Sequence, residues 1–260
     1  MRAKFSCEVK SVSLLLSGKH VLNEIGLAFE SGELVALIGP NGAGKSSLLR
    51  VLAGELQVTQ GEIYFCGNAL GKWDIEERAK RLAVLPQSSS LSFPYTVEEV
   101  VKLARLPHAS GCQRDSEIVD AALEAMDLLS LRKQIYTQLS GGEKQRTQLA
   151  RVLAQIWPEP NIHPSLLLLD EPCSALDPGH ADLLTQQLKA FCRLGATVVM
   201  VLHDVNFASL HASRIIALDK GEVIADGKPE NVINTELLNA LFSSSGHVFK
   251  HPILGYPVYL

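Results

Sequence analysis

One run of the chain, GPNGAGKSS, contains residue types that could hold a phosphate group. Its Gly39, Gly44, Lys45 and Ser46 fit the pattern G-x-x-x-x-G-K-[ST]. Glycines allow backbone N–H groups to surround an anion, and a helix that begins at this point adds partial positive charge. In a phosphate site the lysine would reach the terminal phosphates and the serine hydroxyl would ligate Mg²⁺. A glycine-rich turn without a ligand would need neither residue. We therefore expect a nucleotide to be bound by Gly39, Pro40, Asn41, Gly42, Ala43, Gly44, Lys45, Ser46 and Ser47.

A second run, LLLLDEPCSALD, places two carboxylates directly after four leucines. By itself it could be a metal site, a cysteine nucleophile at Cys173, or a buried strand that ends in solvated acids. With a phosphate site upstream, a P-loop nucleotide hydrolase is favoured, in which a second buried strand presents an acid to the metal. We expect Asp170 to hold Mg²⁺ through water and Glu171 to be the general base, whose loss typically costs ~10²–10⁴ in rate. Cys173 has no base at readable spacing and is not expected to react.

Buried strands and helices must place these residues. Short apolar runs alternate with helical patterns, which indicates an α/β domain with a mostly parallel sheet. Strands are expected at 34–38, 166–169, 197–202 and 215–218, and helices at 45–53, 179–193 and 204–210. Residues 87–140 carry apolar residues at helical spacing without a strand pattern, so they predict an inserted helical subdomain. The run WPEPNIHP at 157–164 predicts a loop, and the poorly patterned tail at 243–260 is assigned no function.

The composition excludes several classes of protein. Apolar residues make up 47% and charged residues 20%, as in ordinary soluble domains, and a net charge of −4 does not indicate nucleic acid binding. No apolar run approaches the ~18 residues of a membrane span. Glu8 and Lys10 interrupt the apolar core that a signal peptide would need. Five widely spaced cysteines without a CxxC pair disfavour disulfides and zinc.

The run LSGGEKQR predicts a second anion site. Ser140 and Glu143 are spaced as a capping box that begins a helix, and two glycines lie at its N-terminus. This run resembles the signature of ATP-binding-cassette (ABC) ATPases, and the resemblance extends over residues 9–241. In that family two copies pack head to tail, and each signature closes over the ATP that the other copy holds.

The resemblance implies further site residues. Gln87 in VLPQ is similar to the Q-loop glutamine, His203 in VLHD to the switch histidine that contacts the γ-phosphate, and SALD at 174–177 to the D-loop that crosses the dimer interface. The implied catalytic residues are Glu171, His203 and Lys45, and Gln87 is implied to bind ATP together with the phosphate loop. The implied ligands of Mg²⁺ are Ser46, Gln87 and Asp170. The residues implied to contact the partner's ATP are Ser140, Gly141, Gly142, Glu143 and Asp177. Leu16 stands where many members have an aromatic residue on adenine, so the adenine contact is not identified.

The resemblance also implies an architecture and a role. Residues 1–260 would form a single ABC ATPase domain with an N-terminal antiparallel β subdomain, a RecA-like core at about 1–86 and 141–242, a helical signature subdomain at about 87–140 and a tail at 243–260. A single cassette without membrane segments is similar to the ATPase subunit of a bacterial importer. Runs such as SFPYTVEEVV and VLHDVNFASLHASRIIALDKGEVIADG resemble importers of heme, ferric siderophores and cobalamin, and LARVLAQIWPEPNIHPSLLLLDEPCSALD resembles heme-import ATPases in particular.

The partners implied are a second copy of the chain, two integral-membrane permease subunits and, indirectly, a periplasmic substrate-binding protein, at the cytoplasmic face of the inner membrane. An exposed Phe93-Pro94-Tyr95 cluster is the expected docking surface, and the alternative is a buried loop. Two other functions are weighed. A soluble ABC ATPase of DNA repair or translation usually carries coiled-coil or zinc insertions or a second cassette, and a small-molecule kinase would leave LSGGE unexplained.

Overall fold

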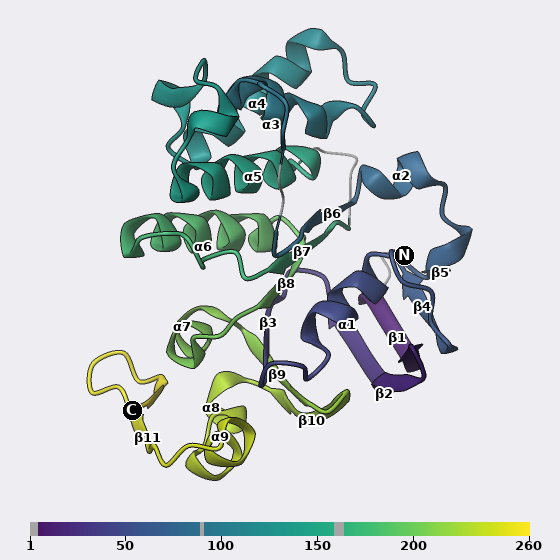
Figure 1. The fold of residues 1–260 in the computed structure, drawn as a ribbon, viewed down its shortest axis with the longest axis vertical. Coiled ribbons are helices and arrows are strands. Elements are labelled where there is room, and N and C mark those ends of the chain that lie inside the picture. The colour runs from purple at the N-terminus through teal and green to yellow at the C-terminus, as the bar shows by residue number, and fades with distance from the viewer. Residues whose placement is uncertain (1–4, 89–90, 159–163) are drawn as a thin grey trace.

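The computed structural model describes residues 5–88, 91–158 and 164–260. The chain is arranged in layers, with helices α3, α4 and α5 at one end, a mostly parallel sheet in the middle and an antiparallel sheet beside α1 (Figure 1). No helix of these described ranges has both the length and the apolar character needed to cross a membrane. The expected fold class, α/β with an antiparallel β subdomain and a helical subdomain, is confirmed.

Six strands of the described ranges form the central sheet in the order β10-β9-β3-β8-β7-β6. They are β3 (Leu34–Ile38), β6 (Leu82–Leu85), β7 (Leu166–Asp170), β8 (Thr197–Val201), β9 (Arg214–Asp219) and β10 (Glu222–Gly227). All neighbours are parallel except β10, which pairs antiparallel with β9. The four strands predicted from apolar runs are confirmed to within one residue at each end, because strands buried on both faces are read from the length of the run.

A second, antiparallel sheet lies against α1 (Lys45–Leu52). In the described chain its order is β2-β1-β4-β5, with β1 (Phe5–Leu16), β2 (Lys19–Glu30), β4 (Gln60–Phe65) and β5 (Asn68–Ala69). A short helix, α2 (Ile75–Ala79), and the 3-10 turn Leu70–Lys72 lead from this sheet to β6. The N-cap of α2 is Asp74, whose carboxylate accepts the first free N–H groups of the helix.

The helical layer consists of α3 (Val97–Lys102), α4 (Cys112–Ala125) and α5 (Gly141–Gln155), joined by 3-10 turns at Leu103–Arg105, Leu129–Leu131 and Tyr136–Gln138. Thr96 and Glu99 form a capping box that begins α3. The helix α5 packs against α3 and α4 as well as against β6, so it connects this layer to the sheet. The subdomain boundaries given above stay a prediction.

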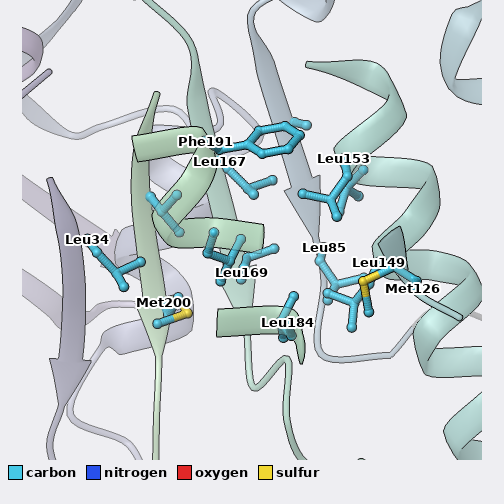
Figure 2. Close-up of a cluster of buried hydrophobic side chains, with 14 of the residues drawn as sticks. Leu34, Leu85, Met126, Leu149, Leu153, Leu167, Leu169, Leu184, Phe191 and Met200 are labelled. Carbon is cyan, nitrogen blue, oxygen red and sulfur yellow. The ribbon is translucent and has the colours of Figure 1, made fainter. Parts of the chain in front are cut away.

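The core is divided by the sheet into two clusters of buried side chains. Along β7, Leu167 and Leu169 pack with the helices of one cluster, while Leu166 and Leu168 pack with the antiparallel sheet and α1 on the other side. Figure 2 shows the first cluster, in which Leu153 of α5 and Phe191 of α6 (Pro178–Arg193) approach the strands. Because successive strand residues face opposite sides, the unbroken apolar run of β7 supplies side chains to both clusters.

The C-terminal part packs beside β9 and β10. It contains α7 (Val205–His211), α8 (Pro229–Val232), α9 (Thr235–Phe242) and a hairpin of β11 (Val248–Lys250) and β12 (Pro257–Tyr259). The amide of Asn206, in α7, donates to the carbonyl oxygen of Tyr259 over 2.9 Å and accepts the Tyr259 N–H over 2.7 Å. The tail without a clear sequence pattern therefore forms a hairpin that is fastened to α7.

Glu98, in the first turn of α3, connects this helix to the segment before α5. Arg132 donates from Nη2 to Oε1 of Glu98 over 2.9 Å and from Nε to Oε2 over 3.3 Å, and Lys133 donates a third hydrogen bond. These contacts, led by Arg132, lower the pKa of Glu98 from 4.5 to about 2. A carboxylate with a depressed pKa stabilises the fold above its unfolded pKa, and this contribution is lost as the pH falls toward its folded pKa.

We expect Glu98→Gln to lower the free energy of unfolding by about 1 kcal/mol at neutral pH, because solvent screening limits a partly exposed ion pair to this size. This corresponds to a melting temperature lower by about 3 °C. The difference from wild type should shrink as the pH falls from about 5 to about 3. Glu117→Gln, which removes an exposed carboxylate of α4, is the control. Equal and pH-independent losses in both variants would contradict the assignment.

Candidate functional site

The ends of three parallel strands bring the predicted site residues to one edge of the sheet. Leu37 of β3 pairs with Val201 of β8, and Val201 pairs with Asp170 of β7. The phosphate loop, His203 and Glu171 follow these three positions directly, so they emerge at the same level. Ligands of open α/β sheets bind outside the carboxyl ends of the strands.

The phosphate loop joins β3 to α1 in a conformation that requires glycine. Gly39 has φ +149° and a Cβ there would lie 2.2 Å from the carbonyl oxygen of Leu218; Gly44, the N-cap of α1, has φ +102°. Lys45 is buried, and its ammonium group donates to the carbonyl oxygens of Gly39 over 2.7 Å and Pro40 over 2.8 Å. Burial lowers the pKa of Lys45, and the carboxylates of Glu171 and Asp170 oppose this effect.

A cavity of about 490 Å³ opens in front of this loop. It is lined by Val21, Asn41, Gly42, Gly44, Lys45, Ser46, Ser47, Gln87, Glu171 and His203. Nine of these ten residues were predicted from the sequence. Of the other predicted ATP-binding residues, Gly39 and Pro40 accept hydrogen bonds from the lysine by their carbonyl groups, and Ala43 is buried.

Glu171 lies at the centre of the polar residues in the cavity. Its Oε1 accepts a hydrogen bond from Nε2 of Gln87 over 2.8 Å, and Nε2 of His203 lies 2.6 Å from the same oxygen. Its φ of +51° is unusual for a residue other than glycine, and such backbone strain is concentrated at functional sites. Gln87 and His203, which were predicted to be the Q-loop glutamine and the switch histidine, therefore both contact the predicted base. No pattern in the sequence indicates these contacts.

Asp170 has the chemistry of a metal ligand. It is buried, and its Oδ1 has no hydrogen-bond partner within the described chain. Burial raises the pKa of Asp170, and a hydrogen bond with the side chain of Ser46 opposes this effect. A buried carboxylate oxygen without a partner, next to a serine hydroxyl, fits a hard cation with oxygen ligands.

The signature residues lie on a different element and do not line this cavity. The predicted capping box is confirmed, because the Ser140 hydroxyl lies 2.7 Å from Oε2 of Glu143 and the Ser140 N–H donates to the same oxygen over 2.8 Å. Gly141 and Gly142 form the first turn of α5. Asp177 is the N-cap of α6, where its carboxylate accepts the His180 N–H over 3.0 Å and contacts the His180 ring. Ser140, Gly141 and Asp177 are exposed, and Gly142 and Glu143 are partly exposed. Their contact with a partner's ATP stays a prediction.

Two features near the cavity involve apolar residues. Val21 of β2 lines the cavity and was not predicted, since an apolar residue in a strand carries no signal of nucleotide contact. Leu16, at the end of β1, is partly exposed but does not line the cavity.

In the loop predicted at 157–164, Trp157 packs edge-on against Phe191 with ring centroids 5.4 Å apart, and residues 159–163 lie outside the described ranges.

Cys173 follows the two acids but is not poised to react. Burial, together with the nearby Asp204, raises its pKa to about 12, so the thiol stays protonated at neutral pH and cannot act as a nucleophile. We expect Cys173→Thr to keep ATP hydrolysis within about threefold of wild type, since the volume is nearly preserved. Steady-state phosphate release measures this, with Lys45→Ala as the inactive reference. A complete loss of turnover in Cys173→Thr would assign the thiol a role.

Comparison with known proteins identifies the family. Residues 22–174 match the model of the ABC transporter family. The hemin import ATP-binding protein HmuV of Pseudomonas entomophila is 47% identical over 96% of this chain and 98% of its own length, and that of Gloeobacter violaceus is 43% identical over 95% and 90%.

Two solved structures share the fold. One, assigned to the metal-chelate type of ABC transporter and inward-facing, has a TM-score of 0.80 at 26% identity, covering 99% of this chain and 97% of that one. The dimeric bacterial ABC transporter cassette MJ0796 has a TM-score of 0.75 at 28% identity, covering 85% and 98%. The chain therefore belongs to the ABC transporter family, as one of its ATPases.

Proposed function

We propose that this chain is the ATP-hydrolysing subunit of a bacterial importer that carries heme (hemin) across the inner membrane. Kinship supports the cargo, because the hemin import ATP-binding protein of Pseudomonas entomophila matches 96% of the chain at 47% identity. The observation that carries the hydrolytic role is the contact of Glu171 with both Gln87 and His203 at the mouth of the phosphate loop.

In this proposal ATP binds with Mg²⁺, and the residues present fit the ion. Ser46 and Asp170 would hold it, Asp170 through water, and Gln87 would complete its surroundings. When bound, the ion neutralises charge on the phosphate oxygens. Lys45 would exchange the carbonyl oxygens of Gly39 and Pro40 for the β- and γ-phosphates.

Hydrolysis would then follow from the arrangement around Glu171. Its carboxylate takes a proton from a water molecule, the water oxygen attacks the γ-phosphorus, and the bond to the bridging oxygen of ADP breaks. Gln87 and His203 hold the carboxylate in place, and His203 would also contact the γ-phosphate. Because these donors are already in position, little reorganisation is needed at the moment of reaction.

The second half of the site would come from another copy of the chain. Ser140, Gly141, Gly142 and Glu143 begin α5 away from the cavity, and helix N-termini favour anions. In a head-to-tail pair, two ATP molecules would join the phosphate loop of one copy to the signature of the other, with Asp177 close to the interface. The structure of MJ0796, which shares this fold, is described as dimeric.

The helical layer would pass this closure to two membrane-spanning permease subunits, and indirectly to a periplasmic substrate-binding protein. The side chain of Phe93 is 66% exposed and that of Tyr95 39%, so the predicted exposed cluster, rather than a buried loop, is found. A groove of about 260 Å³ on the same layer is lined by Leu91, Leu103, Ala104, Pro107, Gln148, Arg151 and Gln155. An exposed aromatic cluster suits a protein contact, so we place the permease here, at the cytoplasmic face of the membrane. No nucleic acid partner is proposed.

We expect Glu171→Gln to bind ATP but to lower phosphate release by at least about 10², because the amide keeps the shape and cannot take the proton. Retained ATP should trap a dimer, visible as an ATP-dependent shift in size-exclusion chromatography. Glu77→Gln, an exposed carboxylate of α2, is the matched control and should behave as wild type. Hydrolysis at the wild-type rate in Glu171→Gln would remove this residue from its role.

The cargo is tested by reconstituting the chain in liposomes with its permease and substrate-binding protein. We expect hemin to stimulate ATP hydrolysis more than a ferric siderophore or cobalamin does, and Glu171→Gln assemblies to show no stimulation. A larger response to a siderophore or to cobalamin would replace heme by that cargo. Co-purification with ribosomes or DNA, and not with a permease, would overturn the transport proposal.

A further inference from the structure

The D-loop, residues 174–177, is attached to the signature helix of its own chain. Nε2 of Gln145, in the second turn of α5, donates to the carbonyl oxygen of Pro172 over 3.0 Å. Next to it, a Cβ on Gly142 would lie 3.0 Å from the carbonyl oxygen of Ala175, so the helix and the loop pack backbone to backbone. The segment that leads into the loop is therefore bonded to α5 at Pro172, and the loop itself packs against α5 at Ala175.

The second half of the loop is held by a histidine between two carboxylates. Nδ1 of His180, in the first turn of α6, lies 2.6 Å from Oδ2 of Asp177, the last residue of the loop. Its other nitrogen, Nε2, lies 3.7 Å from Oδ2 of Asp127, which follows α4 in the helical layer. One imidazole ring thus lies between the D-loop and the helical layer, and it can donate to both carboxylates when each of its nitrogens carries a proton.

Asp127 is itself fixed by the signature helix. Its φ is +52°, a conformation that aspartate and asparagine tolerate better than other residues with side chains. The buried Arg146 of α5 donates from Nη1 to the carbonyl oxygens of Met126 over 3.0 Å and Asp127 over 2.6 Å, and the same nitrogen lies 3.6 Å from the Asp127 carboxylate. A continuous path of polar contacts therefore runs from α5 through Arg146, Asp127 and His180 to Asp177.

We propose that His180 is a positioning residue that keeps the D-loop aligned with the signature helix, so that both elements meet the partner copy as one unit. This inference rests on the dimeric mechanism proposed above. In a dimer, each copy would present Ser140 and Asp177 to the same nucleotide, and their separation is set within one chain. The approach of His180 to Asp127 would align the end of the loop at Asp177, while the Gln145 contact holds the segment before the loop.

The exposure of the two carboxylates indicates that His180 positions the loop and does not stabilise the fold. The side chain of Asp127 is 76% exposed and that of Asp177 61%, and exposed charge pairs contribute little to the free energy of unfolding. The Asp177 carboxylate also accepts a hydrogen bond from the backbone N–H of residue 180, and this bond is preserved when the side chain is replaced. Loss of the imidazole should consequently appear in turnover and not in stability.

The test compares His180→Ala, Asp127→Asn and the double variant in steady-state ATP hydrolysis. We expect each single variant to lower kcat about tenfold with the KM for ATP within about twofold. The double variant should be no worse than His180→Ala, because the contact that Asp127→Asn weakens is already lost with the imidazole. Melting temperatures should stay within about 2 °C of wild type. His247→Ala, an exposed histidine of the tail, is the control and should leave kcat unchanged.

Two conservative variants sharpen the test. The amide nitrogen of glutamine reaches about as far as Nε2 of histidine, and that of asparagine about as far as Nδ1. His180→Gln should therefore recover part of kcat through Asp127, whereas His180→Asn, which reaches only Asp177, should not. Equal recovery by both, additive effects in the double variant, or wild-type kcat in His180→Ala would each overturn the proposal. A turnover per copy that does not depend on protein concentration would instead contradict the dimeric mechanism.

Discussion

The parallel register of β3, β8 and β7 is the constraint on which the site depends. Leu37, Val201 and Asp170 are paired across these strands, so the phosphate loop, His203 and Glu171 emerge at one level. These strands are buried on both faces, so a shift of one residue would turn each side chain to the opposite side of the sheet. The apolar runs therefore do more than fill the core, because they set the distances at which the polar residues meet.

This register explains which parts of the protein could be predicted. Strands buried on both faces are recognised from the length of an apolar run, and the capping box at Ser140 from spacing within one helix turn. Val21 could not be found, since its place in the cavity depends on how β2 packs against the phosphate loop. The hairpin β11–β12 was also missed, because its short strands depend on contacts with Asn206, far earlier in the chain. The path through His180 and Asp127 likewise joins residues whose types and spacing carry no pattern.

Most polar side chains of the cavity are hydrogen-bonded to groups of the protein itself. Lys45 is bound by its own loop, and Glu171 is held between Gln87 and His203. Asp170 differs, because one of its oxygens has no partner among the described residues. In the mechanism proposed above, ATP would replace the hydrogen bonds that Lys45 makes to its own loop, and the hydrated Mg²⁺ would give Asp170 a partner. The left-handed backbone of Glu171 adds local strain at the same point, as is frequent where a side chain must be aimed rather than packed.

The two clusters of buried side chains lie on opposite sides of the sheet, and successive residues of one strand belong alternately to one cluster and to the other. In β7, Leu166 and Leu168 belong to one cluster and Leu167 and Leu169 to the other. Neither cluster can lose its packing while the other keeps an intact strand, so heat or denaturant should dissolve both in a single cooperative event, in spite of the separate layers. The helices of the helical layer share their cluster with Leu167 and Leu169, so this layer and the sheet belong to a structure that melts as a whole.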